Sequence, residues 1–149
     1  MKKLILVLAV FAVSTVTWAQ DHVNLKNNYA AEGYDVVSYF QDNPQKGDKQ
    51  FSHTHEGVRY KFASQENLKI FQDSPDKYIP QYGGYCAYAI AKKGEKVGVN
   101  PKTFVITDGK LYLFYNSWGV NTLEKWNDEG SEQLQKEADK RWQDLVKTQ

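Results

Sequence analysis

Residues 103–115 carry the strongest structural signal in the chain, two apolar runs joined by Asp108-Gly109. Asp-Gly favours the type I′ turn of a two-residue β-hairpin, because both turn positions need positive φ angles. The flanking runs are apolar at successive positions, and successive strand residues point to opposite faces. Both faces of this hairpin are therefore apolar. The pattern predicts a hairpin in the centre of a sheet rather than on a solvated side.

A second hairpin is predicted over residues 51–62, with its turn at Glu56-Gly57. Polar and apolar residues alternate here, which is typical of a strand pair with one buried face. His53 and His55 fall on the apolar face, which also holds Phe51, Val58, Tyr60 and Phe62. We therefore expect both histidines to point toward the core.

The other apolar patterns are mostly helical. Ser64 is a favourable N-cap for a helix over residues 65–72, and Ser74-Pro75 is typical of a second helix start. A short helix is expected over residues 85–91. Residues 33–40 predict a strand or a tight turn leading into one.

Helical spacing returns from Asn121, with a break at Glu129-Gly130, and the last helix is amphipathic. We expect it to cover one face of the sheet. The predicted fold class is α+β, with a small antiparallel sheet built from two β-hairpins, packed with short helices and an amphipathic C-terminal helix.

The N-terminal residues have the pattern of a signal peptide, which predicts that the protein is exported. Lys2 and Lys3 precede an apolar run, and Thr17-Trp18-Ala19 is typical of a signal-peptidase site. We expect residues 1–19 to be a signal peptide, 20–32 a loose lead-in and 33–149 a single domain. Cleavage would leave a periplasmic or secreted protein without a membrane span. The remaining chain is close to neutral, which gives no support for nucleic-acid binding.

Metal-ligating residues are few. Met1 is the only methionine and Cys86 the only cysteine, so no intramolecular disulfide can form. His53 and His55 lie two residues apart on one strand face, and a Cys86 thiolate would add a softer ligand. These three residues are the predicted metal site, and this ligand set suits copper or zinc. The alternative is that His53 pairs across the hairpin with Tyr60, and that Cys86 is a buried thiol.

Cys86 lies in an unusual stretch, residues 78–89, which combines tyrosines with Gly83-Gly84. If a helix begins after Gly84, Cys86 falls in its first turn, where the helix dipole favours a thiolate. Cys–His nucleophilic catalysis with His55 as the base is a further alternative.

The tyrosines of this stretch also predict a pocket for a small ligand, because aromatic side chains often line such pockets. The candidate ligand-binding residues are Tyr82, Tyr85, Tyr88 and Asn116. Core packing is the alternative for the tyrosines, and Asn116 is also a common turn residue.

Several motifs together resemble the exported YHS-domain family. They are Gly33-Tyr34-Asp35-Val36-Val37, Tyr60-x-Phe62-Ala63-Ser64, Pro80-Gln81-Tyr82-Gly83-Gly84-Tyr85-Cys86-Ala87, Gly109-Lys110-Leu111-Tyr112-Leu113 and Ala138-Asp139-x-x-Trp142. The resemblance spans residues 30–142 and implies metal binding. Metal-binding relatives have Phe-Cys-Ser where this chain has Phe62-Ala63-Ser64, which leaves Cys86 and His55 as the ligands that the resemblance implies.

Together these observations predict a non-enzymatic, exported YHS-domain protein that binds a metal ion through Cys86, His55 and His53, with copper preferred to zinc. The alternative function is a metal-free binding or interaction module that uses the tyrosine-lined pocket.

Overall fold

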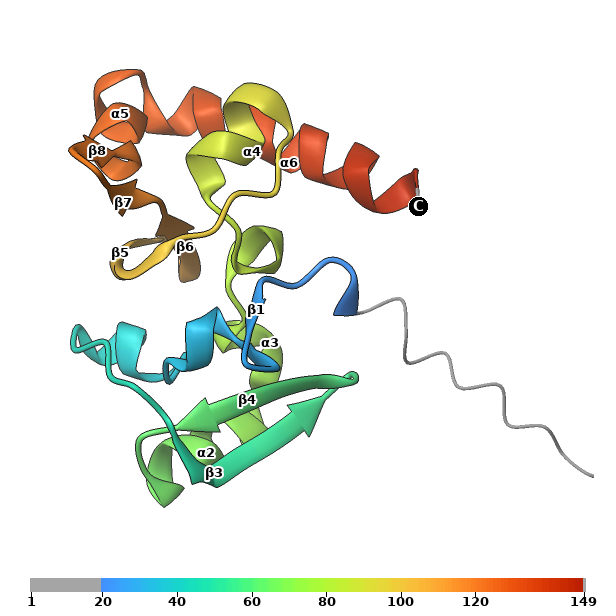
Figure 1. The fold of residues 1–149 in the computed structure, drawn as a ribbon, viewed down its shortest axis with the longest axis vertical. Helices are drawn as coiled ribbons and strands as arrows, with labels where there is room; N and C mark the ends of the chain where they lie inside the picture. The colour runs from blue at the N-terminus through green and yellow to red at the C-terminus, as the bar shows by residue number, and fades with distance from the viewer. Residues whose placement is uncertain (1–19, 149) are drawn as a thin grey trace, which may run out of the picture.

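The computed structural model describes residues 20–148 and confirms the α+β fold class. Residues 1–19, where the signal peptide is predicted, lie outside the described residues. In the described part of the chain, four separate two-stranded antiparallel sheets and several short helices precede a long final helix (Figure 1). Within residues 20–148 no helix is long and apolar enough to cross a membrane.

Both predicted hairpins are confirmed. β3 (Asp48–His55) pairs with β4 (Val58–Phe62), and β5 (Asn100–Thr107) pairs with β6 (Lys110–Phe114). Asp108 and Gly109 have φ angles of 51° and 71°, as a type I′ turn requires. The two hairpins remain separate, whereas a single sheet was expected.

The β5–β6 hairpin lies between two hydrophobic cores instead of between neighbouring strands. Leu111 and Leu113 belong to the first core, together with Tyr39, Phe62 and Phe71. Tyr112 and Phe114 belong to the second, together with Ile90, Trp126 and Ala138. We call these the hairpin core and the helical core. The alternation of β6 side chains thus supplies both, which explains why both faces of the hairpin are apolar.

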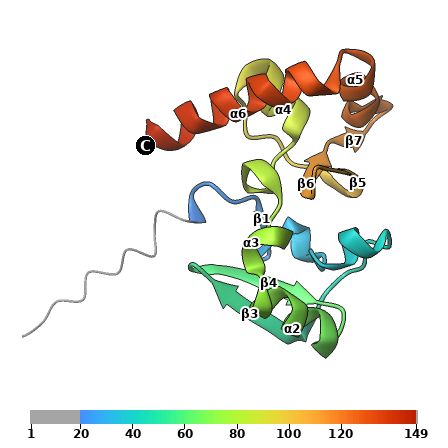
Figure 2. The same cartoon turned by 180° about the vertical axis from the view of Figure 1, so that it is seen from behind.

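The helices surround these two cores. α2 (Gln65–Asp73) and α3 (Pro75–Tyr78) lie with the β3–β4 hairpin, on the other side of the molecule from α4 (Ala87–Lys93), α5 (Thr122–Asp128) and α6 (Ser131–Lys147) (Figure 2). Ser64 caps α2 as predicted, because its Oγ accepts from the Asn67 amide at 3.1 Å. Leu134 and Ala138 of α6 are buried in the helical core, so this helix covers the Tyr112 face of β6 as expected.

The expected loose lead-in is ordered. β1 (Leu25–Lys26) and β2 (Tyr29–Ala30) form a hairpin, and Tyr29, Ala30 and Ala31 are buried. The sequence predicts a loose segment here because residues 22–29 are polar and rich in asparagine. Asn27 and Asn28 instead form the turn, with φ angles of 52° and 66°.

Residues 33–40 form no strand. They continue from the short 3₁₀ turn η1 (Ala31–Gly33) into the 3₁₀ helix η2 (Ser38–Gln41). The buried Asp35 carboxylate accepts from the Val37 and Ser38 amides at 2.9 and 3.2 Å. These side-chain bonds use amides that a strand would need for its ladder, and they favour the turn.

A final small hairpin joins β7 (Asn116–Ser117) to β8 (Val120–Asn121). Its turn residue Trp118 has a φ of 52° and is 94% exposed. Asn116 donates to Thr103 Oγ1 at 3.1 Å, which ties this hairpin to β5.

Candidate functional site

Three consecutive residues with positive φ form the centre of the candidate site. They lie in the 3₁₀ segment η3 (Gln81–Gly84), where Tyr82, Gly83 and Gly84 have φ angles of 55°, 60° and 78°. Glycine adopts this conformation without steric cost, but for tyrosine it costs roughly 1–2 kcal/mol. Strained residues of this kind occur where surrounding contacts hold them, and they concentrate at binding sites.

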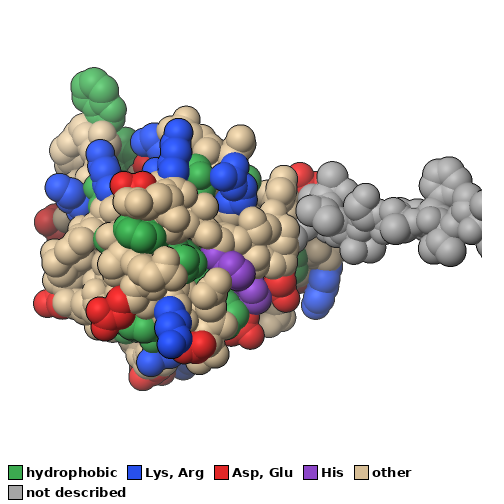
Figure 3. All heavy atoms as spheres, turned by 90° about the horizontal axis from the view of Figure 1, so that it is seen from below, with side chains coloured by type: hydrophobic (Ala, Val, Ile, Leu, Met, Phe, Trp, Pro, Cys, Tyr) green, Lys and Arg blue, Asp and Glu red, His purple; other side chains and the backbone are tan. Residues whose placement is uncertain are grey.

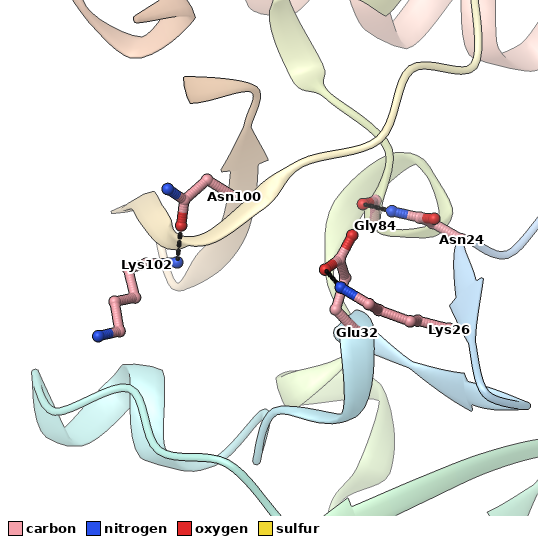
Figure 4. Close-up of polar contacts among 6 residues, drawn as sticks. All are labelled: Asn24, Lys26, Glu32, Gly84, Asn100 and Lys102. Carbon is pink, nitrogen blue, oxygen red and sulfur yellow. Dashed lines mark hydrogen bonds and ion pairs between the residues drawn. The ribbon is translucent and has the colours of Figure 1, made fainter. Parts of the chain in front are cut away.

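Asn24 holds this turn from the N-terminal segment. Its amide donates to the Gly83 carbonyl at 2.8 Å, and its side-chain Nδ2 donates to the Gly84 carbonyl at 3.2 Å (Figure 4). The backbone of His22 passes so close to Gly83 that a Cβ there would overlap the His22 carbonyl oxygen. Gly83 is therefore needed both for its φ angle and for this close approach.

Tyr82 is held from the other side by α6. Its hydroxyl donates to Asp139 Oδ1 at 2.8 Å. Burial raises the pKa of the Tyr82 hydroxyl far above its usual range, and the hydrogen bond to Asp139 raises it further. Tyr82 is therefore a donor to Asp139 at every physiological pH.

Tyr112 lies beside this pair, with its ring centroid 5.8 Å from that of Tyr82. Its hydroxyl is buried, and no group of residues 20–148 forms a hydrogen bond with it. Burial raises the pKa of Tyr112 to about 12, with smaller contributions from the charges of Asp139 and Asp108.

Trp142 of α6 is the aromatic centre of the site. Its ring centroid lies 6.0 Å from that of His22, 6.1 Å from that of Tyr82 and 6.4 Å from that of Tyr85. Trp142 and Gly83 line two pockets. The residues around Trp142 thus separate two adjoining hollows of the surface.

The first pocket has a volume of about 510 Å³ and is open to solvent. Its polar groups come from Gln81, Lys110, Asp139 and Gln143, and its apolar wall from Ile79, Pro80 and Trp142. The second pocket, about 280 Å³, is more apolar and is lined by His22, His55, Val58, Tyr60 and Val146 among others. The first therefore combines an apolar wall that includes Trp142 with several polar side chains, a combination that small-molecule sites share.

Of the predicted ligand-binding residues, the structure places Tyr82 in a pocket wall. Tyr85 packs on Trp142, and its hydroxyl donates to the Val23 carbonyl at 3.3 Å. Tyr88 donates to Glu129 Oε1 at 2.7 Å, and Asn116 donates to Thr103. Tyr85 thus supports the site through Trp142, whereas Tyr88 and Asn116 contact other elements.

Cys86 is fully buried. The sequence predicts Cys86 in the first turn of a helix, whereas in the structure it is the N-cap of α4, directly before that turn. Its Sγ lies 3.3 Å from Thr122 Oγ1, and its amide donates to the Val97 carbonyl at 2.9 Å. These contacts place the thiol between α4 and α5.

The two predicted histidine ligands lie against the hairpin core. As expected from the alternation, His53 is opposite Tyr60 and His55 is opposite Val58. Both rings pack edge-on against Phe71 of α2, with centroid distances of 6.2 and 6.0 Å. His53 Nδ1 lies 3.3 Å from Gln72 Nε2, and His55 Nε2 lies 3.6 Å from Asp76 Oδ1. Histidine side chains also reach the surface on the face shown in Figure 3.

Among residues 20–148 no three or more His, Cys, Asp or Glu side chains form a group that could hold a metal ion. Cys86 contacts α5, and the histidines contact α2 and α3. Copper binding through Cys86, His55 and His53 stays a prediction from the sequence.

Copper titration is the direct test of that prediction. The burial of the thiol against Thr122 favours the alternative, a cysteine that is not a ligand, and we therefore expect Cys86→Ser to leave any Cu(I) or Cu(II) uptake unchanged. Isothermal titration of both proteins measures this. Loss of a stoichiometric copper ion in Cys86→Ser, but not in Thr122→Val, would instead establish Cys86 as a ligand.

Asp139 and Trp142 were not among the site residues predicted from the sequence. Their spacing places them three positions apart on one face of α6, next to Ala138 of the buried stripe. The same two residues occur in one of the motifs that resemble YHS domains. That motif was the signal in the sequence that could have identified them as site residues.

No protein-family model matches the chain, and neither the search of curated proteins nor that of solved structures found a match. The fold and site define an α+β protein with an aromatic pocket between a glycine turn and the C-terminal helix. Membership of the YHS-domain family stays a prediction from the sequence motifs.

Proposed function

We propose that the protein is a non-enzymatic binding protein that holds a small, donor-rich molecule in the first pocket. The observation that carries this proposal is the strained Tyr82-Gly83 turn, held against Asp139 and beside Trp142. Its backbone strain supports a role in shaping the pocket.

The chemistry of the lining supports a particular kind of ligand. Asp139 accepts one hydrogen bond from Tyr82 and has further acceptor capacity, since a carboxylate has about four lone-pair sites. Gln81 and Gln143 add amide groups, and the Trp142 ring offers an apolar wall. A compact ring compound with several hydroxyl or amino groups would use both the carboxylate and the aromatic wall.

Lys110 sets a further condition on the ligand. It is exposed at the rim, at the start of β6, and lies in the same pocket as Asp139. A strongly cationic ligand would be repelled by this ammonium group, and a strongly anionic one by Asp139. The pocket therefore favours neutral or zwitterionic molecules such as saccharides and N-acetylated amino sugars.

Ligand-observed NMR with a panel of mono- and disaccharides and N-acetylated amino sugars tests the proposal. For a hit, Asp139→Asn is expected to weaken binding at least about tenfold, because a hydrogen bond to a charged group contributes roughly 1.5–3 kcal/mol. Trp142→Ala is expected to have an effect of similar size. The melting temperature of each variant shows that it remains folded.

Tyr88→Phe is the matched control, because it removes a tyrosine hydroxyl that is bonded to Glu129 outside the pocket. Binding should be unchanged in this variant. Absence of any saturable hit, or equal affinity in Asp139→Asn and the unmodified protein, would refute the proposed site.

A further inference from the structure

A basic pocket lies where η1, the loop before β3 and strand β4 meet. It has a volume of about 350 Å³ and shares no lining residue with the two pockets around Trp142. The charged residues of its lining are three lysines and one glutamate, namely Lys26, Lys46, Lys61 and Glu32. The lining therefore has an excess of positive charge. We call it the lysine pocket.

Backbone contacts hold the walls of the lysine pocket together. Lys46 pairs with Tyr34 in an isolated antiparallel bridge, and the Gly47 amide donates to the Gly33 carbonyl at 2.9 Å. The loop before β3 also lies against β4, so closely that a Cβ at Gly47 would overlap the Lys61 carbonyl oxygen. The fold of the backbone therefore brings Lys46 and Lys61 to one pocket, although their charges repel each other.

The Lys61 side chain is half-buried and is held along its length. A Cβ at Gly33 would lie 2.6 Å from its Cε and 3.2 Å from its Nζ, and a Cβ at Gly47 would lie 2.7 Å from its Cγ. The ammonium group also lies 4.9 Å from the centroid of the Tyr29 ring, a cation–π contact. Lys61 is therefore pre-organised, and it would lose less side-chain freedom than an exposed lysine when an anion binds.

One of the three lysines has a counter-charge, and the other two do not. Lys26 Nζ lies 3.0 Å from Glu32 Oε2 (Figure 4). In the part of the chain that the structure describes, neither the Lys46 nor the Lys61 ammonium group forms an ion pair with a carboxylate. Two positive charges thus line the same pocket without a negative partner. An anion bound between them would lower their electrostatic energy.

We propose that the lysine pocket binds the phosphate group of a small phosphorylated molecule, with Lys46 and Lys61 as its main contacts. A phosphate monoester has a charge of about −1.5 to −2 at pH 7. Because this charge is concentrated on one group, two ammonium groups can contact it together, and lysine binds phosphate as a point charge. A dicarboxylate divides the same charge between two groups. The proposal goes beyond the proposed ligand-binding function and does not depend on it.

The rest of the lining indicates what the phosphate is attached to. The pocket volume of about 350 Å³ lies in the range of small-molecule sites, so there is room for an organic part as well. Tyr34 and Pro101 add apolar surface, and Asn27 adds an amide. The Tyr39 hydroxyl donates to the Pro101 carbonyl at 2.5 Å, which holds this wall in place. A phosphate attached to a small ring fits this combination, and phenyl phosphate is a suitable probe.

Isothermal titration at low ionic strength and near neutral pH, in a buffer without phosphate, tests the site. The three probes are phenyl phosphate, inorganic phosphate and succinate. We expect saturable binding of phenyl phosphate, weaker binding of inorganic phosphate, and the weakest binding for succinate. Lys46→Gln and Lys61→Gln should each weaken the binding of phenyl phosphate at least about tenfold, because each removes a charged hydrogen-bond donor. The melting temperature of each variant shows whether it is folded.

Three further variants serve as controls. Lys69→Gln makes the same charge change at an exposed position of α2 outside the pocket, and it should leave the affinity unchanged. Glu32→Gln removes the one acidic group of the lining and should tighten binding severalfold, which a merely structural role of the lysines does not predict. Trp142→Ala should have no effect here, so failure of this site can be distinguished from failure of the proposed function.

The decisive variant is Lys46→Gln, because Lys46 is exposed and its replacement should leave the fold intact even if Lys61→Gln does not fold. The proposal is overturned if neither phosphate compound shows saturable binding to the unmodified protein. It is equally overturned if Lys46→Gln binds phenyl phosphate as tightly as Lys69→Gln does. Succinate binding as tightly as phenyl phosphate would overturn the assignment of the pocket to a phosphate group.

Discussion

Asp35→Ala is expected to lower the free energy of unfolding by about 4 kcal/mol, the largest effect of any substitution considered. The Asp35 carboxylate is fully buried, and it accepts from the amides of Val37, Ser38 and Ala63 and from Asn67 Nδ2. Alanine would leave these donors without a partner, and each unsatisfied buried group costs roughly 1–3 kcal/mol before the structure relaxes. Urea denaturation at neutral pH measures the change.

Asp73→Ala is the control for this experiment, because Asp73 is an exposed acid at the end of α2. Its replacement should change the free energy of unfolding by less than about 0.5 kcal/mol. Asp35→Asn should fall between the two, at about 2 kcal/mol, since one oxygen is kept while an NH₂ group faces donors. Comparable stability of Asp35→Ala and Asp73→Ala would show that the network contributes little.

Gly83→Ala is expected to cost about 3 kcal/mol and to detach the N-terminal segment from the site. The left-handed backbone costs an alanine roughly 1–2 kcal/mol. Its Cβ would also overlap the His22 carbonyl oxygen, which displaces the segment and breaks the bond between the Asn24 amide and the Gly83 carbonyl. A lost hydrogen bond adds roughly 0.5–1.5 kcal/mol. Urea denaturation gives the total, and hydrogen exchange at the Asn24 amide reports the detachment.

Gly94→Ala separates the two contributions. Gly94 has a φ of 66°, close to the 60° of Gly83, but an added Cβ would meet no atom within 4 Å. It should therefore show the backbone cost alone, with unchanged exchange at Asn24. If both variants lose equal stability and keep the Asn24 amide protected, the close approach of His22 has no energetic role.

The secondary structure was largely predictable because its signals are local. Asp108-Gly109 and Glu56-Gly57 close the expected hairpins, and Ser64 caps the expected helix. Each signal depends on the φ preferences or side-chain bonds of residues a few positions apart. The sequence left the conformation of residues 33–40 open between a strand and a turn, because the hydrogen bonds of one buried side chain determine it. Asp35 bonds to Asn67, 32 positions away, as well as to its own turn.

The candidate site was only partly predictable. The Tyr82-Gly83-Gly84 turn could be singled out from composition, but its partners come from both ends of the described chain. Asp139 bonds to Tyr82 across 57 positions, and Asn24 bonds to Gly84 across 60. No local pattern encodes such pairs.

The sequence by itself determined the hairpins, the helix starts and the two apolar faces of the β5–β6 hairpin. All of these follow from the alternation of side chains along a strand and from residues that favour turns and caps. Only the tertiary structure decided that those two faces supply separate cores, with Cys86 between α4 and α5 and the histidines against Phe71. Only the tertiary structure, likewise, placed Trp142 beside the glycine turn. The reason is physical: these arrangements depend on how distant segments fill space together.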